Sequence, residues 1–128
     1  MLKKYKIRLG GIDAPERKQD FSNRSKQSLS DLMFSKLVAV ESTKKDRYGR
    51  AVGKVLVDGV DANLIQIESG CAWHYKEYEG EQSGSDRRLH ESAELNAKAA
   101  RRGLWRDAEP VEPWDWRKLQ RLYQRSSN

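Results

Sequence analysis

The sequence contains few of the residues and runs that mark several protein classes. Its one cysteine, Cys71, excludes a disulfide within the chain. The two histidines, His74 and His90, belong to no histidine and cysteine cluster of the kind that binds zinc. No apolar run approaches the length of a membrane span. These absences argue against a disulfide-stapled protein, a zinc protein and a membrane-spanning protein.

A chain of 128 residues predicts one domain with a modest core. The net charge of +6 is unevenly distributed. Residues 1–60 hold 14 Lys and Arg against 7 Asp and Glu, whereas residues 61–128 hold 11 against 12. A polyanionic partner would be attracted to the first half, although mere solubility would also explain the charge.

Two short segments carry the residues with chemistry. Residues 8–16 read RLGGIDAPE and supply Arg8, Asp13 and Glu16, and residues 46–50 read DRYGR and supply Arg50. Guanidinium groups bind phosphate oxygens in pairs, one carboxylate can hold a divalent cation, and a second can take a proton from water. Alone, the first segment is equally compatible with a strand followed by a solvated turn, and the second is more typical of a hairpin turn with a basic rim.

Together, in this order and at this distance, the two segments resemble the thermonuclease (staphylococcal nuclease) family. The resemblance runs from about Tyr5 to Trp105. It implies an α+β fold, an OB-type small β-barrel packed with three helices. It also implies a nuclease-like domain over residues 1–105. Beyond it, the residues themselves predict a tail over residues 106–128, with a connector containing proline and acidic residues and a short helix whose tryptophans pack on the domain; a partner-binding amphipathic segment is the alternative.

The resemblance also implies a role for each residue of the two segments. Asp13 matches the central calcium ligand, and Ala14 stands where a backbone carbonyl contributes. Glu16 matches the carboxylate that acts on the attacking water, and Arg8 and Arg50 match the guanidinium groups that hold the phosphate. The implied activity is calcium-dependent endonucleolytic cleavage of DNA and RNA, with little sequence preference and with 3′-phosphate products.

Three tyrosines are predicted to contact the substrate. Tyr48 lies within the second segment and should sit near Arg50. Tyr75 and Tyr78 lie where the family carries tyrosines beside the bound nucleotide, and the sequence leaves open which of them corresponds. Aromatic faces can stack on bases.

The chain departs from the family at its start. Family members have two more strands ahead of the Arg8 strand, and the turn between those strands supplies an aspartate to the metal. Residues 1–7 contain no acidic side chain. Three explanations stay open: an N-terminal truncation, a partner that replaces the hairpin, or a different fold. An incomplete barrel exposes strand edges, so the chain is expected to be a monomer or an edge-paired or swapped dimer.

Periodicity, turn residues and capping residues predict the order of the elements. The expected elements are a strand over Lys4–Ile12, a helix from Ser22 or Asn23 to about Phe34, strands over Leu37–Ser42 and Arg50–Val57 joined by a charged loop, a helix over Ala62–Ser69 capped by Asp61, and a helix over Asp86–Arg102 capped by Ser85.

Two other classes of function stay open at this stage. One is a nuclease-fold module that has lost catalysis and binds nucleic acid or a protein. The other is an assembly module that pairs through an exposed barrel edge. The first residues show no signal-peptide pattern, although many members of the family are exported, so the compartment is left open.

Overall fold

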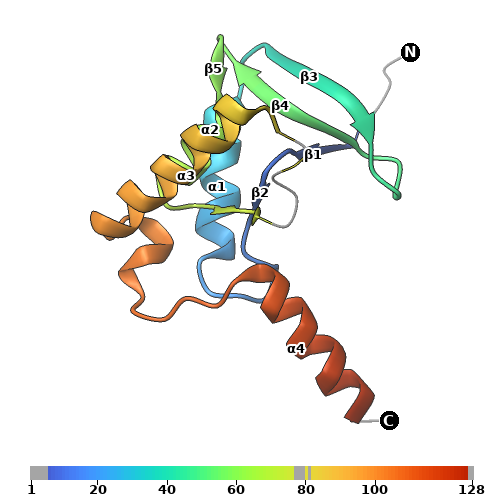
Figure 1. Ribbon diagram of the computed structural model, residues 1–128, viewed down its shortest axis with the longest axis vertical. Helices are drawn as coiled ribbons and strands as arrows, with labels where there is room; N and C mark the ends of the chain where they lie inside the picture. Colours follow the sequence, from blue (N-terminus) through green and yellow to red (C-terminus); the bar gives the residue numbers. More distant parts are fainter. Residues whose placement is uncertain (1–5, 77–79, 81, 127–128) are drawn as a thin grey trace.

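The computed structural model describes residues 6–76, 80 and 82–126. The chain contains both strands and helices, with β3, β4 and β5 consecutive, which supports the predicted α+β class (Figure 1). In the part of the chain so described, no helix has the length and apolar character needed to cross a membrane.

Strand β4 (Ala51–Val57) forms the centre of the main sheet. Strand β1 (Ile7–Leu9) pairs with it in parallel, and β3 (Val38–Lys45) pairs with it antiparallel on the other side. The short strand β5 (Val60–Asp61) folds back on the end of β4. The predicted loop between the two long strands is shorter than expected, because β3 continues to Lys45 through an irregularity between Ser42 and Lys44.

The strand predicted over Lys4–Ile12 divides at its two glycines; residues 4 and 5 lie outside the described part of the chain. Gly11 has φ +75°, a left-handed conformation that glycine adopts without strain. Beyond it the chain enters a second sheet, in which β2 (Ile12–Asp13) pairs antiparallel with β6 (Trp73–His74). Arg8 and Asp13, five residues apart, therefore belong to different sheets.

Helix α1 spans Ser22–Met33 and α2 spans Ala62–Glu68, close to their predicted bounds. Asp61 caps α2 as expected, because its side chain accepts a hydrogen bond from the Leu64 N–H. The predicted serine or asparagine cap of α1 is wrong. The residue before that helix is Phe21, at φ +75°, and the Ser22 hydroxyl donates instead to the Arg17 carbonyl.

Helix α3 spans Gly84–Ala99, so the predicted start and end are both late. The cap is Ser83, whose hydroxyl accepts from the Asp86 N–H at 3.1 Å, and not Ser85. A 3-10 turn, η2 (Gly103–Arg106), follows and buries Leu104 and Trp105.

The buried side chains form three adjoining clusters. The first packs beneath α1 and contains Val55, Val57 and Ala62. The second lies between α2 and α3 and contains Ile12, Ile67, Ala72 and Ala93. The third fills the end near η2 and contains Trp73, Ala97, Leu104 and Trp105. The two histidines are buried beside the second sheet, with Gln82 hydrogen-bonded to both.

Helix α4 (Pro113–Ser126) leaves the body at a steep angle, and its C-terminal end projects away from the other elements (Figure 1). Its first turn is attached, because Pro113 is fully buried and Trp114 packs edge-on against Trp73. Leu122 and Tyr123, further along, are 53% and 72% exposed.

The side chain of Asn63 joins β1, β4 and α2 from the inside. Its amide nitrogen donates to the carbonyls of Gly10 at 3.1 Å and Gly53 at 3.0 Å, and its amide oxygen accepts from the Val55 N–H at 3.1 Å. The residue is 2% exposed. This amide therefore supports the end of β1, which the strand pairing and the hydrogen bond from the Gly10 N–H to the Gly53 carbonyl also hold against β4.

Replacing Asn63 should destabilise the fold more than its size suggests. Asn63→Ala removes the partners of buried backbone groups, at roughly 1–3 kcal/mol for each group left unpaired, so we expect a loss of about 3 kcal/mol. Asn63→Asp should be comparably harmful, because a carboxylate cannot donate to the two carbonyls. Urea unfolding measures both, with the exposed Asn23→Ala as control. A loss under 1 kcal/mol for both variants would contradict this role.

Candidate functional site

The two predicted phosphate-binding arginines share one carboxylate. Arg50 Nε donates to Asp46 Oδ2 at 2.8 Å, and Arg8 Nε lies 3.5 Å from the same oxygen. Arg8 comes from β1 and Arg50 directly precedes β4, so the parallel pairing of these strands brings them together. Asp46 orients both guanidinium groups.

Asp46 is itself fixed by the turn that it begins. Its Oδ1 accepts from the backbone N–H groups of Tyr48 at 2.9 Å and Arg50 at 3.0 Å. Desolvation would raise the pKa of Asp46, but these two N–H groups and the Arg50 guanidinium lower it below its ordinary value. The carboxylate is therefore held ionised.

The predicted metal ligand Asp13 and the predicted catalytic carboxylate Glu16 both contact one guanidinium group. Arg117 of α4 donates from Nη2 to Asp13 Oδ2 at 2.7 Å and from Nη1 to Glu16 Oε1 at 2.5 Å. Asp13 lies at the end of β2, and Glu16 lies in the loop that follows. Ala14, between them, is exposed.

This contact changes the charge balance of the group. Burial raises the pKa of Asp13, and the positive charges of Arg117 and Arg8 offset only part of that effect. For Arg117, burial would lower the pKa, but the hydrogen bonds and charges of Asp13 and Glu16 raise it above its ordinary value. Two carboxylates this close to each other require a positive charge, and here a guanidinium supplies it.

Gln19 connects the Glu16 loop to the segment before α4. Its side-chain oxygen accepts from the Glu16 N–H at 2.8 Å, and its side-chain nitrogen donates to the Val111 carbonyl at 2.9 Å. The loop that carries Glu16 and the start of α4 are thus held by one side chain.

The predicted tyrosines fall at two ends of this cluster. Tyr48 is 67% exposed, and the guanidinium carbon Cζ of Arg50 lies over its ring, 5.6 Å from the ring centroid. Tyr75 follows β6, and its hydroxyl lies 3.4 Å from Arg117 Nη2. The face of Tyr75 is covered by Trp114, which stacks on it at 5.1 Å with 13° between the planes. Tyr78 lies outside the described residues.

The oxygen donors of this cluster suit a hard cation such as calcium. The positive charge that Asp13 and Glu16 hold together in this structure is the guanidinium of Arg117. In the described residues, no third acidic, histidine or cysteine side chain joins these two to form a ready metal cluster.

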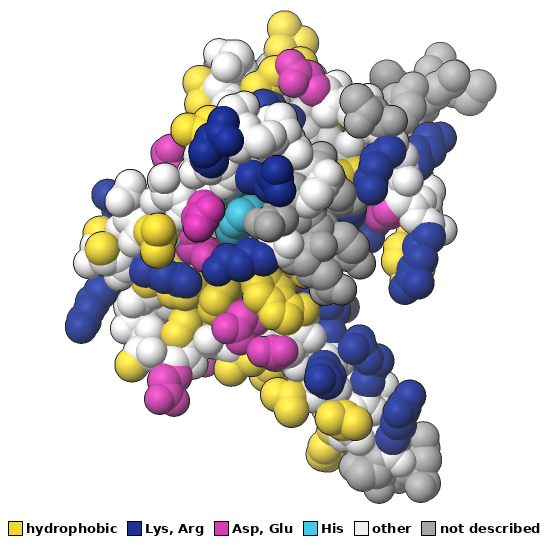
Figure 2. All heavy atoms as spheres, viewed as in Figure 1, with side chains coloured by type: hydrophobic (Ala, Val, Ile, Leu, Met, Phe, Trp, Pro, Cys, Tyr) yellow, Lys and Arg dark blue, Asp and Glu magenta, His cyan; other side chains and the backbone are white. Residues whose placement is uncertain are grey.

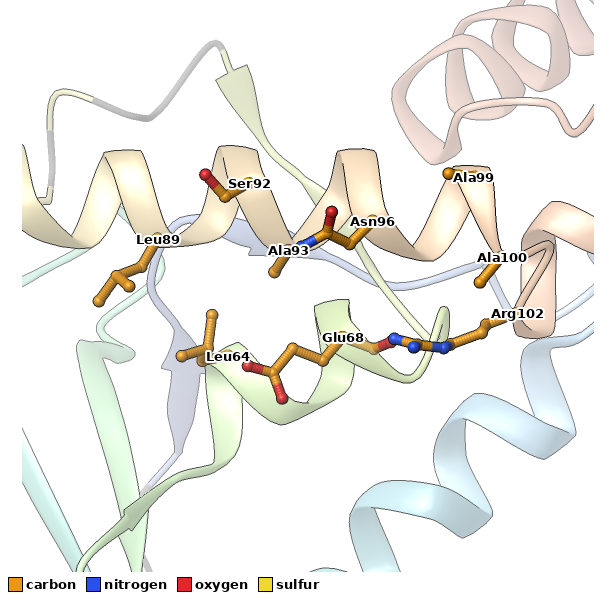
Figure 3. Close-up of a pocket in the computed structure, with 9 residues that line it drawn as sticks. All are labelled: Leu64, Glu68, Leu89, Ser92, Ala93, Asn96, Ala99, Ala100 and Arg102. Carbon is orange, nitrogen blue, oxygen red and sulfur yellow. The ribbon is translucent and has the colours of Figure 1, made fainter.

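A separate groove of about 640 Å³ lies between α2 and α3 (Figure 3). Leu64 and Glu68 line one wall, and Leu89 and Asn96 line the other. Its described lining includes none of the predicted site residues, so the candidate site is the charged cluster and not this groove.

With this geometry in view, comparisons with known proteins identify the family. A sequence model described as staphylococcal nuclease homologue matches residues 6–107. This chain belongs to the staphylococcal nuclease family. The match includes both motif segments, whereas α4 and Arg117 lie beyond it.

Relatives of this nuclease-family chain include plant and bacterial proteins. It is 38% identical over 121 residues to the probable staphylococcal-like nuclease CAN1 of Oryza sativa subsp. japonica, covering 94% of this chain and 35% of the relative. It is 39% identical over 120 residues to an uncharacterized endonuclease of Haemophilus influenzae, covering 94% of this chain and 64% of the relative. The chain thus spans about a third of the plant protein and under two thirds of the bacterial one.

Sequence reasoning missed the residues that organise this family site. Asp46 stands within a quoted motif, and its position two residues before Tyr48 is typical of a side-chain turn, a signal that could have been used. Arg117 lies 104 residues from Asp13, and no local pattern connects the two.

The two functions of Asp46 can be separated by substitution. Asp46→Asn keeps a carbonyl oxygen for the turn but loses the acceptor for Arg50 Nε, so we expect faster exchange of the Arg50 Nε–H in NMR spectra. The free energy of unfolding should fall only slightly, because the ion pair is partly exposed. Asp46→Ala should lower it further, since the turn hydrogen bonds are lost too. Unchanged Arg50 exchange in Asp46→Asn would show that another group orients the arginine.

Proposed function

We propose that this chain is a calcium-dependent endonuclease domain that hydrolyses phosphodiester bonds of DNA and RNA, with little sequence preference and with 3′-phosphate ends. One observation carries the proposal: two arginines share Asp46, while Asp13 and Glu16 share one positive charge beside them. Both family membership and the names of the relatives, nuclease and endonuclease, support it.

The arginines would bind the substrate phosphate. Each guanidinium presents a planar pair of donors to two non-bridging oxygens, and Asp46 holds the Nε side of Arg50 so that the group is preorganised. Such a site contacts the nucleic acid backbone and not the base edges, which accounts for the low sequence preference and for the acceptance of both DNA and RNA.

Glu16 would act on the attacking water. Its carboxylate takes a proton as the water oxygen forms a bond to phosphorus in line with the leaving group. The bond between phosphorus and the 5′ oxygen breaks, and that oxygen takes a proton from solvent. The phosphate stays on the 3′ side, and Arg8 and Arg50 stabilise the charge on its equatorial oxygens.

Asp13 and the backbone carbonyl of Ala14 would hold calcium, which neutralises phosphate charge when bound. Tyr48 lies beside Arg50 and is positioned to contact a nucleotide that flanks the bound phosphate. Tyr75, whose hydroxyl lies beside Arg117, would contact a second nucleotide only once Trp114 leaves its face. The outer strands β1 and β3 each pair with β4 alone in the described residues. We propose that strands added at those edges close the OB-type barrel.

One observation favours a second function, a nucleic acid-binding module that does not cleave. Asp13 and Glu16 already share the positive charge of Arg117, and among the described residues no third candidate ligand joins them. The two functions differ in one measurement: a binding module retains DNA with or without calcium and leaves it intact.

The enzyme function predicts a dependence on Glu16 and calcium together. Glu16→Gln should lower the rate of plasmid cleavage by roughly 10²–10⁴-fold, the usual contribution of a general base. A calcium chelator should abolish cleavage by the parent chain. The matched control is Glu91→Gln, an exposed substitution on α3 that should leave the rate unchanged. Full turnover in chelator would rule out the calcium mechanism.

The shape of the Arg50 side chain should matter as much as its charge. Arg50→Lys keeps the charge but loses the planar pair of donors and the Nε bond to Asp46, so we expect kcat/KM to fall by roughly 10²-fold. Arg87→Lys, on an exposed part of α3, controls for charge at the same salt concentration. If both variants cleave like the parent, Arg50 supplies only a general positive field.

A further inference from the structure

Helix α4 covers two parts of the proposed site at once. Arg117 occupies the oxygens of Asp13 and Glu16, and one turn earlier Trp114 stacks on the face of Tyr75. These are the carboxylates proposed to bind a cation and the water, and the aromatic face proposed to bind a base. One helix therefore fills the place of a cation and the place of a nucleotide.

We propose that α4 is an autoinhibitory latch, which must move away from Asp13, Glu16 and Tyr75 before a divalent cation and a single-stranded nucleic acid segment can bind. This inference rests on the proposed function. The conflict is direct, because Arg117 donates to an oxygen of each carboxylate that the proposed reaction uses.

The attachment of α4 suits a part that can be released. Three features hold its start: the buried Pro113, the Trp114 stack, and the hydrogen bond from Gln19 to Val111. Beyond Arg117, Leu119 and Leu122 are more than half exposed, and the helix protrudes from the body (Figure 2). The buried residues of the three clusters all precede α4, so its release would uncover only the side of the cluster around Trp73 on which Trp114 packs.

Substrate chemistry would favour release. Calcium competes for the two carboxylates, and a polyanion competes for the guanidinium of Arg117. The freed helix keeps basic side chains, Arg117, Lys118, Arg121 and Arg125, as seen in the Lys and Arg groups along its protruding part in Figure 2. A nucleic acid phosphate would bind the guanidinium of Arg117, and calcium would bind the carboxylates of Asp13 and Glu16. Both ligands therefore compete with the ion pairs that hold α4 in place.

The test compares two variants of equal charge, Arg117→Gln and Arg121→Gln. Arg121 lies one turn further along α4 and is exposed. Calorimetric titration with calcium should give Arg117→Gln an affinity about tenfold or more above the parent, the factor expected if α4 is docked in nine molecules of ten. Arg121→Gln should match the parent, and Asp13→Asn should lose calcium binding.

A second measurement needs no metal. Binding of a labelled single-stranded DNA oligonucleotide in chelator, followed by fluorescence anisotropy, should be tighter for Arg117→Gln than for Arg121→Gln, because only the first substitution frees the site. The reverse order would overturn the latch and make Arg117 a third phosphate-binding arginine. Equal calcium affinity for the parent and Arg117→Gln would also overturn it, while leaving the nuclease function intact.

The remaining outcome separates the two proposals. If neither the parent nor Arg117→Gln binds calcium, the calcium-dependent function fails, and so does a latch that competes with calcium. If calcium binds and the oligonucleotide order is as expected, both proposals stand.

Discussion

The buried amide of Asn63 is the constraint on which the site depends. Arg8 and Asp13 belong to two sheets, separated by the turn at Gly10 and Gly11, so their relative position is not set by strand pairing alone. The amide of Asn63, a residue of α2, donates to the carbonyls of Gly10 and of Gly53 in β4. It thereby joins the turn after β1 to β4, the strand that Arg50 directly precedes. Three donor and acceptor groups of one side chain thereby position residues that are remote in sequence.

The fold could be predicted where local chemistry decides the structure. Asp61 is the clear capping residue before α2, and the residues that follow it have an apolar face that is buried. The predicted bounds of α2 therefore agree with the observed ones to within one residue. The start of α3 was misplaced because Ser83 and Ser85 are both suitable caps, and their hydroxyls lie 3.2 Å apart. For α1, the hydroxyl of Ser22 found a partner in the preceding loop, a contact that helix periodicity cannot reveal.

The same limit applies to the candidate site. Residues within one motif, such as Asp13 and Glu16, are brought together by short chain segments, and their types alone indicated phosphate and metal chemistry. The relation between the motifs arises from the parallel pairing of β1 with β4. The role of Arg117 depends on where α4 leaves the body, which in turn depends on Pro113 and Trp114. The role of Arg117 as the counter-charge to Asp13 and Glu16 therefore could not be predicted from the sequence alone.

Electrostatics explains why such a counter-charge is needed. Burial raises the pKa of Asp13 and the neighbouring Glu16 raises it further, whereas the guanidinium of Arg117 opposes both effects. A protonated carboxyl is a poor ligand for calcium and a poor base for water. Arg117 lowers the pKa of Asp13 through a hydrogen bond and through its charge, which favours the ionised form of that carboxyl without fully offsetting burial. The contact that covers the Asp13 carboxyl is thus also a contact that favours its ionised form.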